Sequence, residues 1–190
     1  MMRHLRSSSV IGWLVLALCA ACDSSGSPQI PKVMCGTRVD PDVARPLFGS
    51  GTDWHEWDRV DRAEALTAPC LVLSDRGVVV RLRFSWDENA TDLMYLAKNT
   101  GTVSGIADPR HITSPYTTLI GTDGAISTAP CGTKGGDYFT LTLQLPRIAR
   151  TDRSHRGDIE KFMRAYFPAT LKTLGCRTAP PASPRPGQER

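Results

Sequence analysis

The sequence predicts an α+β fold: an antiparallel sheet covered on one face by a C-terminal amphipathic helix and cross-linked by two disulfides. Three observations lead to this fold class. Two segments alternate between apolar and polar residues, as strands with one buried face do. A segment near the C-terminus repeats its apolar residues every three or four positions, as an amphipathic helix does. Four cysteines between residues 35 and 176 form an even set, which is typical of disulfides in an exported chain.

The clearest strand covers residues 78–86. One face of it carries only apolar side chains, namely Val78, Val80, Leu82, Phe84 and Trp86. The opposite face carries Val79, Arg81, Arg83 and Ser85. Residues 74–77 are Ser-Asp-Arg-Gly, a sequence typical of a turn, and the apolar residues 71–73 precede them. We therefore expect a hairpin between 71–73 and 78–86.

A second strand is expected over residues 138–145, where Phe139, Leu141, Leu143 and Leu145 share one face. Between the two strands, Asp123-Gly124 is typical of a tight turn and separates residues 117–122 from 125–128. One apolar and one polar face per strand favours an antiparallel sheet that is covered on one side only.

The covering helix is predicted over residues 158–174. Asp158 suits its N-terminal turn and Gly175 suits its C-cap, whereas Pro168 is expected to kink or split it. A shorter helix is expected over residues 91–98. In residues 40–66 we expect one helical turn at 41–45 and irregular structure elsewhere.

The N-terminal residues form a targeting segment. A positive start is followed by an apolar run of 12 residues, 10–21, which is too short to span a bilayer, since a spanning helix needs about 20 residues. Ala20 and Ala21 then precede Cys22, and a polar stretch rich in serine and glycine follows it.

This arrangement resembles the signal peptides of bacterial lipoproteins. The resemblance covers about the first 27 residues and implies cleavage before Cys22 with a diacylglyceryl group on its thiol. One departure is Cys19, which stands where that family usually has leucine. The alternative is an ordinary signal peptide cut after Ala21. The excess of arginine over lysine, with abundant alanine, glycine, proline and threonine, also resembles small lipoproteins of actinomycetes.

If the chain is such a lipoprotein, it has four parts. Residues 1–21 are the signal peptide, 22–34 a lipidated flexible tether, 35–176 a single domain and 177–190 a proline-rich disordered tail. Removing the signal segment lowers the formal net charge from +4 to +2, which favours no strong electrostatic partner. We expect a lipid-anchored protein on the extracytoplasmic face of the cell membrane, which binds no nucleic acid.

With Cys22 lipidated and Cys19 removed, the cysteines that remain are Cys35, Cys70, Cys131 and Cys176. They lack the paired spacing of a zinc site, so we expect disulfides and no metal. Thr-Ala-Pro-Cys occurs at both 67–70 and 128–131, which suggests equivalent positions before two strands and favours the disulfide Cys70–Cys131. The two cysteines left over would then form Cys35–Cys176. The pairing Cys35–Cys70 with Cys131–Cys176 and the crossed pairing stay open.

The densest cluster of chemically active side chains is Trp54, His55, Glu56, Trp57 and Asp58, followed by Asp61. Histidine and carboxylates bind metals or move protons, and two tryptophans can stack on a ligand. A surface loop anchored by its tryptophans explains the same residues, and we favour that interpretation.

A basic stretch between Arg147 and Arg164 is a candidate surface for anionic headgroups or envelope polymers, although a solvated loop and helix face is the simpler interpretation. The chain has no G-x-S-x-G elbow, P-loop or G-x-G-x-x-G motif, so no residue is assigned a catalytic role and no cofactor is expected. The sequence therefore favours a binding or interaction module, with an unknown protein or envelope-polymer partner. A small secreted hydrolase or metal-dependent enzyme that uses the His55–Asp61 region is the alternative.

Overall fold

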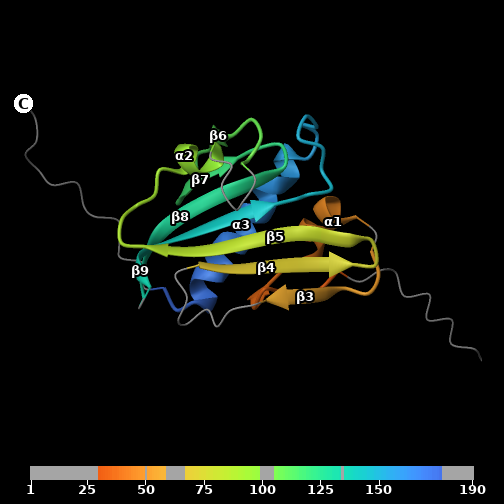
Figure 1. Cartoon of the computed structure of the whole chain (residues 1–190), viewed down its shortest axis with the longest axis horizontal. Helices are drawn as coiled ribbons and strands as arrows, with labels where there is room; N and C mark the ends of the chain where they lie inside the picture. The colour runs from red at the N-terminus through yellow and green to blue at the C-terminus, as the bar shows by residue number, and fades with distance from the viewer. Residues whose placement is uncertain (1–29, 50, 59–66, 99–104, 134, 177–190) are drawn as a thin grey trace, which may run out of the picture.

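The computed structural model describes residues 30–49, 51–58, 67–98, 105–133 and 135–176. These residues form a seven-stranded sheet, a two-stranded hairpin and three helices (Figure 1). The fold is α+β, its large sheet is antiparallel throughout, and a C-terminal helix covers one face, as the sequence predicts.

The strand order across the large sheet is β3-β4-β5-β9-β8-β7-β6. Its two central hairpins are β4–β5 and β8–β9. The β4–β5 hairpin, and the β7–β8 hairpin that turns at Asp123-Gly124, are those expected from the sequence. The bounds of the strands are β3 His55–Asp58, β4 Thr67–Ser74, β5 Gly77–Asp87, β6 Arg110–His111, β7 Thr117–Ile120, β8 Gly124–Thr133 and β9 Gly136–Gln144.

Two helices lie behind the sheet as Figure 1 shows it, and the main core lies between them and the strands. The longer helix, α3 (Arg156–Thr173), buries the apolar stripe that the sequence predicts, and its Phe167 stacks on Phe139 of β9 at 6.0 Å between ring centroids. The helix runs through Pro168 without being split. The shorter helix, α1 (Pro41–Phe48), extends further than the single turn expected, because Asp40 caps its N-terminus and Phe48 packs edge-on against Phe162.

The packed part of the chain begins before Cys35, where the sequence placed the domain boundary. Ile30 is buried, and the hairpin of β1 (Val33–Met34) and β2 (Thr37–Arg38) follows it. Tyr166 of α3 donates a 2.8 Å hydrogen bond to the carbonyl of Met34, which fastens this hairpin to the helix. Residues 30–34 are therefore packed against the core rather than part of a flexible tether.

The two disulfides join Cys35 to Cys70 and Cys131 to Cys176. The favoured pairing, Cys70–Cys131 with Cys35–Cys176, was therefore wrong. Cys70 and Cys131 lie on β4 and β8, three strand steps apart, which corresponds to roughly 14 Å. A disulfide needs Cα atoms within about 7 Å, and the observed pairs are 6.1 Å and 4.7 Å apart.

Gly175 positions the second disulfide. It adopts a positive φ of 69° after the end of α3, where a residue with a side chain would be strained. The N–H of Cys176 donates to the carbonyl of Leu171 and that of Gly175 to Lys172, the pattern of a Schellman cap. The cap residue itself is Leu174, and the glycine expected at the C-cap lies one residue beyond it, where it turns Cys176 back toward Cys131 on β8.

Edge strand β3 was not foreseen, because residues 40–66 were expected to be irregular beyond one helical turn. Its four residues are all exposed and polar apart from Trp57, so the strand has no alternating pattern. Two hydrogen bonds between Thr52 and Asp75 fix the start of this strand. The backbone N–H of Thr52 donates to the Asp75 carboxylate, and the backbone N–H of Asp75 donates to the Thr52 carbonyl. The hydrogen bond from the Thr52 N–H holds the pKa of Asp75 below its usual value.

Within the residues that the structure describes, the face of the sheet opposite α3 is covered only in part. Helix α2 (Leu93–Lys98), expected from the sequence, packs over β7 and β8 through a second apolar cluster. That cluster consists of Leu93, Ala97, Ile106, Leu119 and Ile126. Among the described residues, no helix is both long and apolar enough to cross a bilayer.

Candidate ligand-binding face

A surface formed by β4, β5 and β9 lies beside the part that α2 covers, and we call it the open face. Strand register defines it, because residues paired directly across antiparallel strands project to the same side. Leu71, Arg81 and Gln144 form one row, and Pro69, Arg83 and Thr142 form the next. Figure 1 views the sheet from this side, with α3 behind it.

The open face is hollowed. A cavity of about 400 Å³ is lined by Thr67, Pro69, Leu71, Arg81, Leu82, Arg83, Thr142 and Gln144. This volume lies toward the lower end of the range of about 300–1,000 Å³ that is usual for small-molecule sites. The lining combines apolar side chains from β4, two cations from β5 and polar groups from β9. Such a mixture suits a ligand with one charged end and one apolar end.

The two arginines give the open face its charge. Within the described part of the chain, neither the Arg81 nor the Arg83 side chain makes a hydrogen bond or ion pair with another residue. Arg81 is exposed, whereas the Nε of Arg83 is buried and has no partner. A buried donor without a partner is costly, so native proteins satisfy nearly all of them. The unpaired Nε therefore marks Arg83 as a group that a ligand would complete.

The sequence contained a signal for this face. The alternation over residues 78–86 already put Arg81 and Arg83 on the outer side of their strand. The pairing of β5 with β9 was not predictable from the sequence. This pairing places the uncharged Thr142 and Gln144 directly beside the two arginines. Sequence reasoning therefore missed the two arginines as a site.

Trp57 extends the apolar side of the open face. It pairs with Leu71, so its side chain projects to the same side as the row that contains Arg81. It is 42% exposed, which is unusual for so large an apolar side chain. Trp57 thus lies at the edge of the open face, where an aromatic ring can contact a ligand.

The structure separates the other members of the predicted Trp54–Asp58 cluster. Because β3 is a strand, His55 projects to the side of Trp57, whereas Glu56 and Asp58 project to the α3 side. Trp54 packs on Phe48 and donates its indole N–H to the Gly51 carbonyl, as the anchored-loop interpretation expects. His55 contacts the carbonyl of Asp53, and Asp61 lies outside the described residues.

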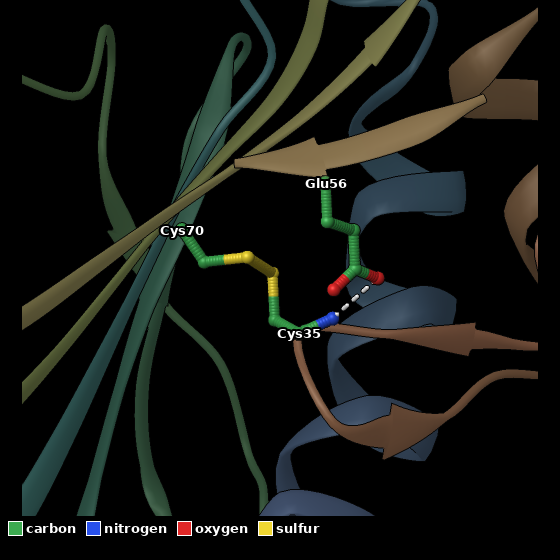
Figure 2. A group of neighbouring side chains, drawn as sticks. All are labelled: Cys35, Glu56 and Cys70. Atoms are coloured by element: carbon green, nitrogen blue, oxygen red, sulfur yellow. Dashed lines mark hydrogen bonds between the residues drawn. A yellow bond between two sulfur atoms is a disulfide. The ribbon is translucent and has the colours of Figure 1, made fainter. Parts of the chain in front are cut away.

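Glu56 has a local structural partner. Figure 2 shows its carboxylate pointing toward Cys35, whose backbone N–H donates to it at 2.8 Å. Cys35 has a positive φ of 49°, and this hydrogen bond holds it in that conformation. The Cys35 and Cys70 sulfurs lie within 4.8 Å of the carboxylate, a spacing suited to a metal. Because the two sulfurs are bonded to each other, they are not available as thiolate ligands.

Internal contacts use most of the basic stretch. Arg147 donates to Ser74 and Gly77, and Arg164 to Glu160 and Thr113. Arg153 and Arg156 both pair with Asp108, and Arg150 pairs with Asp123. Asp152 accepts hydrogen bonds from the hydroxyl and backbone N–H of Ser154, which lower its pKa. These internal contacts hold most of the arginines in place, although Arg153 and Arg156 share one carboxylate and Arg147 has uncharged partners.

Neither a protein-family model nor a curated protein matches this chain, and no solved structure matches it either. Cys22, the predicted lipidation site, lies outside the described residues.

Proposed function

We propose that the protein is a lipid-anchored binding module on the extracytoplasmic side of the membrane, and that it holds its ligand on the open face. The single observation that carries the binding function is the hollow on β4, β5 and β9, where Arg81 and Arg83, without partners among the described residues, lie beside apolar side chains. The two disulfides are consistent with an oxidising compartment. The signal-like segment that ends at Cys22 supports the anchor.

The enzyme alternative has weaker support. It requires His55 and Glu56 to act together, yet they project to opposite sides of β3. Glu56 is also occupied by the Cys35 backbone. No observation on the described residues favours a hydrolase or metal enzyme over a binding module.

Fractionation of cells tests the anchor. We expect the wild-type chain in the membrane fraction and the Cys22→Ser variant in the soluble extracytoplasmic fraction, because the variant lacks the thiol that would carry the lipid. Cys19→Ser is the matched control and is expected to remain with the membrane. Retention of Cys22→Ser in the membrane fraction would refute lipidation at this residue.

A variant that fills the hollow tests the binding site without assuming any ligand chemistry. Thr142 is half-buried in the lining, so Thr142→Phe places a ring inside the hollow. Purified protein is incubated with a small-molecule extract of the cell envelope, and the retained compounds are measured by mass spectrometry. We expect enrichment by the wild type and by Thr173→Phe, a control on the exposed side of α3, and none by Thr142→Phe. Equal enrichment by all three proteins would place binding elsewhere.

A further inference from the structure

We propose that the open face selects a small, free amphipathic molecule with a single oxyanion head, such as a carboxylate, and an apolar body. This inference rests on the proposed binding function and names the chemical class of its ligand. Arg83 binds the head together with Arg81, and the side chains of β4 with Trp57 contact the body.

Charge complementarity selects the head group. Arg81 and Arg83 lie two residues apart on one strand and project to the same side, so their positive charges add over the hollow. The acidic side chains at the two ends of this surface are engaged elsewhere. Asp87 accepts the hydroxyl of Thr91 and lies four residues, roughly 13 Å, along β5 from Arg83. Asp123 accepts the backbone N–H of Ala107 and pairs with Arg150. The described surroundings therefore leave a local excess of positive charge over the hollow.

Arg83 is suited to an oxyanion in particular. A guanidinium presents its N–H groups in a planar fork that matches the two oxygens of a carboxylate or phosphate. In Arg83 the Nε arm of this fork is buried and has no acceptor in the described part of the chain. A turn of the guanidinium that exposes this donor to the hollow lets a head group at its base supply the acceptor, where little water competes for it. An uncharged head accepts the same hydrogen bond but gains no ionic contribution from the second arginine.

The apolar body is selected by the β4 side of the hollow. Pro69 and Leu71 are both half-buried in register with the two arginines, and Trp57 extends the same row at the edge of the sheet. A chain or ring that leaves the head therefore passes over apolar surface. The limited volume of the hollow, about 400 Å³, favours a small molecule over a macromolecular segment.

The closing experiment is isothermal titration of the purified full chain carrying Cys22→Ser with decanoate below its micellar concentration. Decanol is the uncharged probe of the same chain length. We expect decanoate to bind at least tenfold more tightly than decanol, a difference of at least about 1.4 kcal/mol, and its affinity to fall as salt is raised. Arg83→Gln is expected to weaken decanoate at least tenfold. Arg45→Gln removes one exposed cation from α1, on the other side of the sheet, and is expected to leave binding unchanged.

Three outcomes would overturn the inference. Equal binding of decanoate and decanol would show an apolar site without charge selection, which leaves the proposed binding function intact. Binding of decanoate that Arg45→Gln weakens as much as Arg83→Gln would show a non-specific charge effect. Tight binding of phosphatidylglycerol vesicles through Arg83, with no binding of free decanoate, would assign the open face to a membrane surface. The envelope-extract experiment with Thr142→Phe decides separately whether the open face binds any ligand.

Discussion

Replacing Arg83 with methionine should make the unliganded protein more stable. Arg83 lies in the middle of β5, between Pro69 and Thr142, and its Nε is buried with no acceptor among the described residues. Methionine keeps an unbranched apolar stem on the same sheet face, and it removes both the unpaired donor and the charge beside Arg81. Most substitutions within a sheet destabilise, so an increase in stability is a distinctive result.

The expected size follows from the unpaired donor. Leaving a buried donor unsatisfied costs about 1–3 kcal/mol, and part of that gain is offset by the packing that the guanidinium loses. We therefore expect the free energy of unfolding to rise by about 1 kcal/mol. For a chain of this size that corresponds to an increase in Tm of about 2–4 °C.

Urea denaturation of both proteins measures this difference, with the transition midpoint expected to rise at an unchanged slope. Arg81→Met is the matched control: Arg81 is exposed, so its replacement is expected to change stability by less than about 0.5 kcal/mol. Saturating decanoate is expected to stabilise the wild type by at least about 1.4 kcal/mol more than it stabilises Arg83→Met, which corresponds to the tenfold loss of affinity. If Arg83→Met destabilises the protein by about 1 kcal/mol or more, Arg83 is a structural residue and the reasoning fails.

Three further predictions concern the scaffold. Gly124→Ala is expected to destabilise the protein by about 1–3 kcal/mol, because the new Cβ would collide with the backbone of β9. Gly132→Ala on the same strand is the control: its Cβ meets no atom, so stability should change by less than about 0.5 kcal/mol. Equal losses of stability in thermal unfolding would contradict this prediction. Glu56→Ala should cost about 1 kcal/mol in urea denaturation by removing the acceptor of the Cys35 N–H, while Glu56→Gln retains most of it; no loss on Glu56→Ala would argue against this role. The lowered pKa of Asp75 adds stability at pH values above the unfolded pKa of about 3.9, and this stability is lost as the pH falls through the folded pKa. The difference in stability between wild type and Asp75→Asn should therefore shrink below about pH 4, and a difference independent of pH would contradict this.

The sequence was most informative where a local pattern repeats. Strands β5 and β9 and helix α3 each bury a stripe with the period of their own backbone, so a window of residues was enough to predict them. β3 lacks any such pattern. Its position at the edge of the sheet comes from pairing with β4 and from the contact between Thr52 and Asp75, which are distant in sequence.

Spatial order was the information that the sequence lacked. The repeated Thr-Ala-Pro-Cys does mark two strands with similar roles, since Cys70 and Cys131 each lie on the outer strand of a central hairpin. The repeat could not show that β5 and β9 lie between these strands and keep the two cysteines apart. The same missing order hid the open face, because Arg81 and Arg83 become a site only when uncharged residues of β9 lie beside them.

The most direct test of the open face is the NMR signal of the Arg83 side chain itself. In a ¹⁵N-labelled chain, the Nε–Hε cross-peak of Arg83 is assigned by its disappearance in Arg83→Met, and its shift is followed as decanoate is added. We predict a saturable shift of this cross-peak as its buried proton gains an acceptor, with no shift of the Arg45 cross-peak. If decanoate binds and the Arg83 cross-peak does not move, the head group lies elsewhere and the central claim is wrong.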